Sequence, residues 1–140
     1  MRILHAADLH LDSAFGALSS DQARQRRRES REILNTLADL VCKERVNLVL
    51  LSGDLFDGER VYPETIELLQ GALKRMRCPV FISPGNHDPF VPKSPYAKEQ
   101  WPENVHIFQT EKLTAVPVPE LGCVVYGAAF TDQHRHTEVL

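Results

Sequence analysis

The stretch Val46-Asn47-Leu48-Val49-Leu50-Leu51-Ser52-Gly53-Asp54 decides the fold. Its first six residues form a nearly unbroken apolar run, which is typical of a strand buried on both faces, as in a parallel sheet. The run stops at Ser52-Gly53, where the residue types favour a turn. We therefore expect a β-strand over 46–51, followed directly by Asp54.

The same pattern occurs before and after this stretch. Residues 3–7 form a short, mostly apolar run that ends at Asp8, and residues 80–82 form another that stops at 83–85. Each run predicts a strand, so three strands are expected with a polar residue shortly after each one.

Helices are predicted in both intervals between these strands. Ser19 and Gln22 have the spacing of a capping box, so a helix is expected to begin near residue 20 or 21 and to run to about residue 44. Pro63 occupies a favoured first-turn position for a second helix, which Pro79 ends.

The order strand–helix–strand–helix–strand places the chain in the α/β class with parallel strands and right-handed crossovers. The texture then changes, because prolines break residues 88–104 into a loop with one helical turn at most. Three shorter strands are expected over 105–108, 113–118 and 123–128.

Composition bounds the functional class. The chain has 140 residues, 43% of them hydrophobic and 25% charged, with a net charge of −3. These values predict one globular domain with a sizeable core and exclude a basic coat over the whole surface. A local basic patch or a metal-lined groove is still compatible with them.

The cysteines and the N-terminus predict a cytoplasmic protein. Cys42, Cys78 and Cys123 form neither a CxxC pair nor a zinc spacing, so we expect buried free thiols in a reducing cytosol. Residues 1–5 enter a strand without a signal-peptide pattern, and no apolar run approaches ~18 residues, so no membrane segment is expected.

Three polar motifs follow the three predicted strands: Asp8-Leu9-His10, Gly53-Asp54 and Gly85-Asn86-His87-Asp88. In an open α/β sheet, ligands bind beyond the carboxyl ends of the strands. We therefore expect these motifs to meet at one sheet edge and to form one site.

The donor types in these motifs predict a two-metal centre. The expected ligands are Asp8, His10, Asp54 and Asn86, with Asp54 able to bridge two cations. A mixed oxygen and nitrogen set without thiolate favours Mn²⁺, Fe²⁺ or Zn²⁺. Two cations ~3.5–4 Å apart can hold a phosphate, activate water and stabilise in-line displacement.

His87 and Asp88 are the predicted catalytic residues beside this centre. His87 is expected to face the phosphate, where it could stabilise the developing charge or protonate the leaving oxygen. Asp88 could orient the imidazole of His87, or it could cap the loop that follows.

The motifs together resemble the calcineurin-like metallophosphoesterase superfamily, whose pattern is D-x-H, then G-D-x-x-D, then G-N-H-D/E. The fuller match over 3–12 and 51–57 is similar to its DNA-repair nuclease branch, which includes SbcD, Mre11 and YhaO-like proteins. The resemblance implies a β-sandwich flanked by helices, of which βαβαβ is the first half.

The resemblance also assigns roles. It gives Asp8 and His10 to a first metal, makes Asp54 the bridging ligand, gives Asn86 to a second metal and makes His87 the catalytic histidine. Two further carboxylates match accompanying positions and are expected to have supporting roles: Asp12 and Asp57.

One departure from the family pattern concerns the later histidines. The family has a lone His and a G-H-x-H later in the chain, whereas this sequence has only His134 and His136 there, without a preceding glycine or strand. The departure implies that residues 1–140 are the N-terminal portion of a longer protein. Such a portion would hold metal weakly and would expose a sheet edge that favours pairing with a second copy.

Three functions are therefore compatible with the sequence. The first is a Mn²⁺-dependent nuclease domain that cuts DNA, for which the resemblance implies an ATPase partner subunit. The second is a phosphatase or small-molecule phosphodiesterase. The absence of an Arg-Gly pair after Asp57 argues against the protein-phosphatase branch of the superfamily. The third is an inactive fragment or scaffold.

Four arginines share one face of the first predicted helix: Arg24, Arg27, Arg28 and Arg31. This face is either a footprint for phosphate groups or a solvated face paired with neighbouring glutamates. Tyr96 and Trp101 either stack on a base or pack their loop onto the body. His5 is expected to pack in the core.

Overall fold

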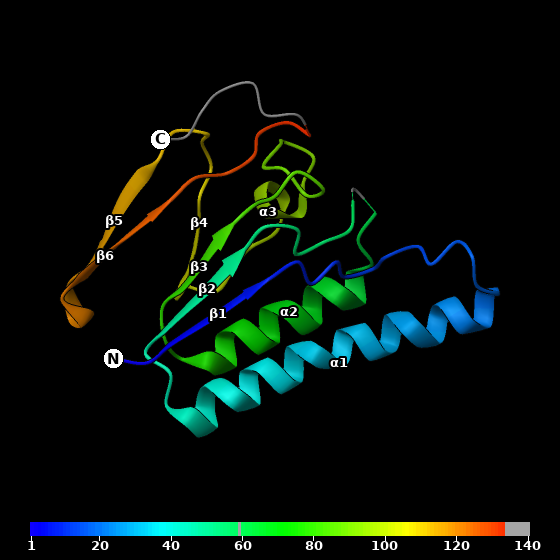
Figure 1. Cartoon of the computed structure of the whole chain (residues 1–140), viewed down its shortest axis with the longest axis horizontal. Coiled ribbons are helices and arrows are strands. Elements are labelled where there is room, and N and C mark those ends of the chain that lie inside the picture. Colours follow the sequence, from blue (N-terminus) through cyan, green and yellow to red (C-terminus); the bar gives the residue numbers. More distant parts are fainter. Residues whose placement is uncertain (59, 134–140) are drawn as a thin grey trace.

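The computed structural model describes residues 1–58 and 60–133. It has three layers: two long helices, a four-stranded sheet and a two-stranded hairpin (Figure 1). The elements follow one another as β1 (Ile3–Ala7), α1 (Ser20–Glu44), β2 (Leu48–Ser52), α2 (Pro63–Met76), β3 (Val80–Ser83), α3 (Pro95–Lys98), β4 (Val105–Ile107), β5 (Thr114–Val118), the 3₁₀ turn η1 (Pro119–Leu121) and β6 (Cys123–Gly127).

The central sheet confirms the predicted α/β class. Its strands lie in the order β1-β2-β3-β4, and every neighbouring pair is parallel. Residues Ala6, Leu51, Ile82 and Ile107 share one row of the sheet. Because the strands are parallel and in register, the ends of β1, β2 and β3 reach the same edge.

The predicted helix signals also hold. The backbone N–H of Gln22 donates to Ser19 Oγ at 3.4 Å, and the backbone N–H of Ser19 donates to Gln22 Oε1 at 3.2 Å. Pro63 is the first residue of α2. Strand β2 begins two residues later than expected, because the N–H of Val46 still donates to the carbonyl of Val41 at the end of α1.

The main core lies between the two helices and the sheet. Leu34 and Val41 of α1 and Leu73 of α2 are almost completely buried there, against Val49 and Val80 of the central strands. A smaller core lies under the β5–β6 hairpin, on the other side of the sheet. The two cores show why β2 and β3 are apolar on both faces.

Two predictions about burial are wrong. His5 is exposed because β1 is an edge strand and the hairpin core forms around residues of β2 and β3 and around Phe108, just after β4. Cys42 is also exposed and Cys123 is half-buried, whereas Cys78 is buried as expected. The sequence left open whether Tyr96 and Trp101 stack on a base or pack their loop onto the body, and the structure shows packing. Tyr96 is buried, and its carbonyl accepts the Trp101 indole N–H at 3.3 Å.

No helix in the described part of the chain has the length and apolar character of a membrane-spanning segment. The prediction that His134 and His136 do not match the late family motif lies outside the described residues.

Candidate metal centre

The loops that leave β1 and β2 run side by side beyond the sheet edge. The N–H of Asp8 donates to the carbonyl of Gly53 at 3.1 Å, and the N–H of His10 donates to the carbonyl of Asp54 at 2.9 Å. The N–H of Leu11 then donates to the carbonyl of Leu55 at 2.9 Å. These bonds continue the strand pairing and hold the first two motifs together.

Unusual backbone conformations turn the side chains of these loops toward one another. Asp8, His10 and Asp54 have φ values of 53°, 45° and 48°. Positive φ is uncommon for residues other than glycine and costs about 1–3 kcal/mol each, so it persists only where surrounding bonds enforce it. Such conformations concentrate at functional sites, which marks this edge of the sheet.

Two groups of candidate ligands meet at His10. One group consists of Asp8, His10 and Asp54, and the other of His10, Asp57 and His87; within each group the ligand atoms lie within 4.8 Å of one another. The sequence predicted that the three motifs would share one site, and the structure brings these side chains together.

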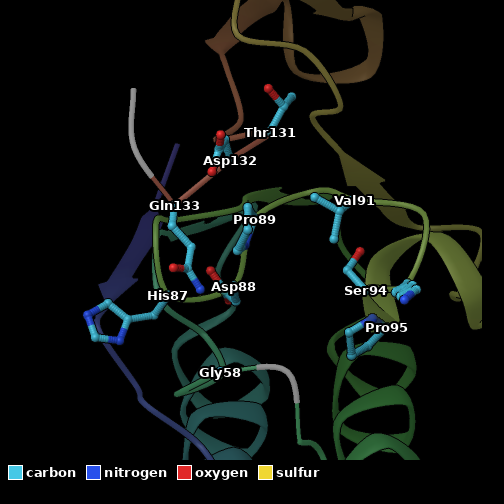
Figure 2. A pocket seen from close by; sticks show the side chains of 11 residues that line it. Gly58, His87, Asp88, Pro89, Val91, Ser94, Pro95, Thr131, Asp132 and Gln133 are labelled. Atoms are coloured by element: carbon cyan, nitrogen blue, oxygen red, sulfur yellow. The ribbon is translucent and has the colours of Figure 1, made fainter. Parts of the chain in front are cut away.

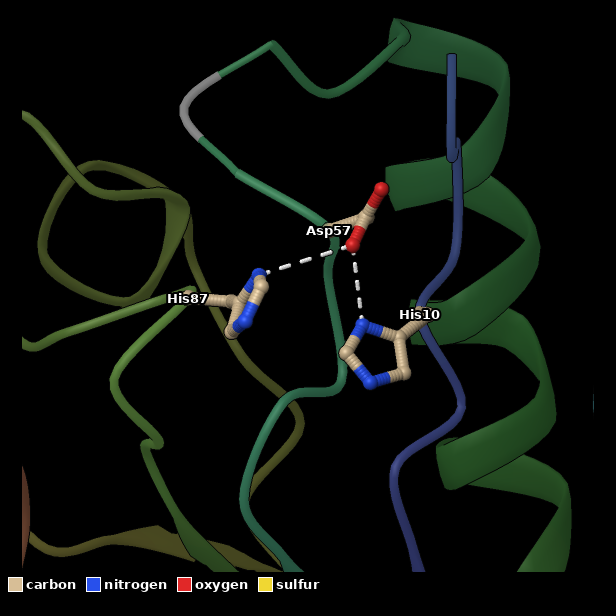
Figure 3. A group of neighbouring side chains, drawn as sticks. All are labelled: His10, Asp57 and His87. Carbon is tan, nitrogen blue, oxygen red and sulfur yellow. Dashed lines mark hydrogen bonds and ion pairs between the residues drawn. The ribbon is translucent and has the colours of Figure 1, made fainter. Parts of the chain in front are cut away.

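Asp57 lies between the two histidines (Figure 3). Its Oδ1 is 2.9 Å from His10 Nδ1 and 3.6 Å from His87 Nδ1. Its Oδ2 accepts the Ser13 hydroxyl at 2.6 Å. Burial acts to raise the pKa of Asp57, but the hydrogen bonds from Ser13 and His10 outweigh it and hold that pKa below its usual range.

The third motif is tied to the second through the backbone. The N–H of His87 donates to Asp54 Oδ1 at 2.9 Å. A Cβ added to Gly85 would lie 2.1 Å from the same oxygen, so only glycine leaves room for this approach. Asn86 is exposed and lines a hollow together with Asp57 and His87. The predicted ligand Asn86 therefore borders the second group.

Asp88 turns inward from this site. Its carboxylate accepts the N–H of Phe56 at 3.0 Å, the N–H of Gly85 at 2.7 Å and the Tyr96 hydroxyl at 2.5 Å. The sequence predicts that Asp88 either orients the imidazole of His87 or caps the loop that follows, and these bonds correspond to the capping role. Burial raises the pKa of Asp88, against the opposing effect of the three donors.

A buried carboxylate supports the first loop from below. Asp12 has a fully buried side chain and accepts from Arg31 at 2.9 Å, from the Thr65 hydroxyl at 2.8 Å and from the N–H of Tyr62 at 2.8 Å. The guanidinium of Arg31 also lies over the Tyr62 ring. Arg31 therefore has a structural role. The interpretations of this face as a phosphate footprint or as a solvated face now concern the other three arginines: Arg24, Arg27 and Arg28.

Sequence reasoning gave Asp57 a supporting role and did not single out Ser13. The structure places Asp57 in contact with His10 and Ser13, and it places Ser13 directly after the anchored Asp12. The signal for Asp57 was its spacing of three residues after Asp54. No pattern in the sequence indicates the Ser13 contact, because its partner lies 44 positions away.

The chain is similar to known phosphoesterases. The family model for calcineurin-like phosphoesterases matches residues 1–138. The uncharacterized metallophosphoesterase YhaO of Bacillus subtilis is 34% identical over 116 residues, which cover 79% of this chain and 28% of that protein.

A nuclease subunit and a DNA repair protein are similar to this chain as well. A subunit of the nuclease SbcCD from Rhodobacter capsulatus is 35% identical over 94 residues, covering 64% of this chain and 22% of that protein. The DNA double-strand break repair protein Mre11 of Saccharolobus solfataricus is 31% identical over 91 residues, covering 63% and 23%. The chain thus spans about a quarter of the length of these relatives.

Proposed function

Because the chain belongs to the calcineurin-like phosphoesterase family, we propose that it is the N-terminal part of a metal-dependent nuclease that hydrolyses DNA phosphodiesters. The observation that supports this most directly is the group of Asp8, His10 and Asp54, whose ligand atoms lie within 4.8 Å of one another. Asn86 lies next to this group, since it lines a hollow together with Asp57 and His87. A set of oxygen and nitrogen donors of this kind suits a two-metal phosphoesterase. This donor chemistry fits Mn²⁺, with Fe²⁺ or Zn²⁺ as alternatives.

We assign Asp8, His10, Asp54 and Asn86 as the residues that would hold two divalent cations. Bound there, the cations would position a phosphodiester, activate water and neutralise developing charge. Asp57 holds the ring of His10 in place. The hydrogen bond from the backbone N–H of His87 to the Asp54 carboxylate holds the loops of the second and third motifs together.

His87 is the proposed general acid. Its Nδ1 faces Asp57, which leaves Nε2 as the ring nitrogen that can donate a proton to the leaving oxygen. The ring is about half exposed and stands edge-on to His10, with centroids 5.2 Å apart. A substrate phosphate can therefore approach it from solvent. Asp88 contributes by holding the loop that carries His87.

Metal binding tests the site itself. Calorimetric titration of Mn²⁺ should show saturable binding to the whole protein that contains this chain. Asp54→Ala should weaken this binding at least about tenfold, because the Asp54 side chain is the proposed bridging ligand and also accepts the N–H of His87. The matched control is Asp21→Ala, which changes an exposed carboxylate on α1 and should bind Mn²⁺ as the wild type does. Equal Mn²⁺ binding by Asp54→Ala would favour the scaffold hypothesis instead.

Substrate comparison tests the reaction. The whole protein that contains this chain should cleave single- or double-stranded DNA under Mn²⁺, and His87→Gln should lower kcat by about 10²–10⁴. Efficient hydrolysis of an aryl phosphodiester or phosphomonoester without any cleavage of DNA would favour the phosphatase or small-molecule phosphodiesterase.

Partners and location are further parts of the proposal. The Rhodobacter relative is a subunit of a nuclease, which supports a partner subunit for this protein. We propose that this partner is an ATPase, as the family resemblance implies. Strand β1 has one unpaired edge in the described residues, which supports pairing with a second copy. Light scattering after size-exclusion chromatography tests the dimer, and fractionation of cells tests the proposed cytoplasmic location.

A further inference from the structure

We propose that the cavity beside His87 is a subsite for the nucleoside attached to the scissile phosphate. The proposal rests on the proposed function and adds the substrate group that the protein recognises next to the metal centre.

The cavity adjoins the metal centre through His87, which lines it and also belongs to the ligand group with His10 and Asp57 (Figure 2). Gly58, which directly follows Asp57, lines the same cavity. A group esterified to a phosphate at the His10–His87 site can therefore extend into this space without leaving the protein surface.

The size of the cavity fits one nucleoside. Its volume is about 410 Å³, in the lower part of the ~300–1,000 Å³ range of small-molecule pockets. Pro89, Val91 and Pro95 supply apolar wall surface. Enzymes that hold a single base place it between apolar or aromatic side chains and read its polar edge by hydrogen bonds.

Ser94 supplies a polar group without a partner. Ser94 is 7% exposed, and among the described residues its Oγ has no hydrogen-bond partner. Ser94 precedes α3 in the N-cap position, yet its side chain makes no cap bond. A buried hydroxyl without a bond costs free energy. Because Ser94 lines the cavity, a turn of its side chain would bring this hydroxyl, which is closed to solvent here, to a polar ligand and would remove that cost.

The opposite wall carries more hydrogen-bonding groups and is held in place. Thr131 and Gln133 line the cavity across from Val91. The N–H of Phe130 donates to the carbonyl of Pro84 at 3.0 Å, and the N–H of Phe90 donates to the carbonyl of Phe130 at 2.7 Å. These bonds tie the segment that leads to Thr131 and Gln133 to the segment that carries Val91.

The mixture of walls favours a nucleoside over simpler substituents. A methyl or other alkyl ester would leave the hydroxyl of Ser94 and the amide of Gln133 unused, and an unsubstituted aryl ring would bury them without bonds. A nucleobase offers apolar faces and a polar edge at once, and hydroxyl and amide side chains can bond to that edge.

The test uses the whole protein that contains this chain and compares thymidine 5′-monophosphate with methyl phosphate in the presence of Mg²⁺. The titration is followed through the methyl NMR signals of Val91 and Thr131. The nucleotide should bind more tightly than methyl phosphate and shift both signals. Ser94→Ala should weaken the nucleotide by about three- to tenfold and should fold normally, because the hydroxyl it removes has no partner in the described structure.

A second variant fills the space. Val91→Trp should reduce nucleotide binding further and leave methyl phosphate binding unchanged, whereas the control Val124→Trp changes an exposed side chain on β6 and should bind both as the wild type does. Equal affinities for the two phosphates, or Val91→Trp binding like its control, would overturn the subsite.

Failure of the metal centre gives a different result. If neither phosphate binds, the proposed function is contradicted, and thymidine alone then decides on the subsite. Shifts of the Val91 and Thr131 signals by thymidine in the wild type, together with loss of the Thr131 shift in Val91→Trp, support it, and their absence overturns it.

Discussion

Ser13 is the residue on which the orientation of Asp57 depends. It donates to one carboxylate oxygen and thereby directs the other toward His10 and His87. Asp57 in turn bonds to the proposed ligand His10 at 2.9 Å, so Ser13 acts on that ligand through Asp57. Partners that orient metal ligands typically contribute about 10–100-fold to metal affinity. We expect Ser13→Ala to weaken Mn²⁺ binding within this range, measured by calorimetry, while thermal unfolding changes little.

The conservative replacement distinguishes orientation from packing. Ser13→Thr keeps the hydroxyl and should restore most of the Mn²⁺ affinity. If Ser13→Ala and Ser13→Thr bind Mn²⁺ equally well, Ser13 does not position Asp57.

Asp88 predicts how stability depends on pH. Its pKa is raised in the folded state, chiefly by burial, so the folded protein binds more protons than the unfolded chain between the two pKa values. Its contribution to the free energy of unfolding is therefore fully present below the usual pKa near 3.8 and decreases as pH rises through the folded value.

Asp88→Asn removes this pH dependence and also loses hydrogen bonds. An amide presents an NH₂ group to one of three donors, so we expect a loss of about 1–3 kcal/mol. Denaturant unfolding at several pH values from 4 to 7 measures both effects, with exposed Asp21→Asn as control. A pH slope in Asp88→Asn equal to that of the wild type would assign the slope to other groups.

At the scale of elements, local signals were sufficient where the stabilising contacts are local. The Ser19–Gln22 capping box and Pro63 predict where α1 and α2 begin, because their partners lie within one turn. Contacts such as Arg31 with Asp12 join residues 19 positions apart. The spacing of the arginines shows that they share a face. Which of them meets the carboxylate of Asp12 depends on how α1 crosses the loop after β1, and the sequence does not show this.

The Arg31–Asp12 pair connects α1, the first loop and the start of α2. Asp12 is fully buried, so removing its cation leaves a buried carboxylate with too few partners, which typically costs about 3–5 kcal/mol. Arg31→Leu should therefore destabilise the protein strongly in denaturant unfolding. Arg26→Leu, which removes an exposed ion pair with Glu29, should change stability little, because solvent screens such a pair. Similar losses for both variants would contradict this difference.

At the scale of the whole molecule, the site could be predicted because parallel strands bring distant motifs to one edge. The exposure of His5 could not, since it depends on which strands the hairpin covers. The same hairpin continues into residues 128–133, where Ser83 donates to the carbonyl of Ala128 and Phe130 bonds to the loop before His87. The outer layer thus braces the loop that carries the third motif.

Gly127 is the position where this outer layer meets the sheet most closely. A Cβ there would lie 2.1 Å from the Phe108 ring, which itself packs between Phe81 and His106 and has little freedom to move. Gly127→Ala should therefore cost about 1–3 kcal/mol through overpacking. Gly71→Ala is the matched control, because Gly71 lies in α2 with open space around it and alanine should stabilise the helix by up to about 1 kcal/mol.

A double-mutant cycle locates the cause. Phe108→Leu shortens the side chain, so Gly127→Ala should cost less in that background than in the wild type, measured by denaturant unfolding. Because the hairpin braces the loop before His87, Gly127→Ala should also weaken Mn²⁺ binding, whereas Gly71→Ala should not. Equal costs of Gly127→Ala in both backgrounds would show that its effect does not pass through Phe108.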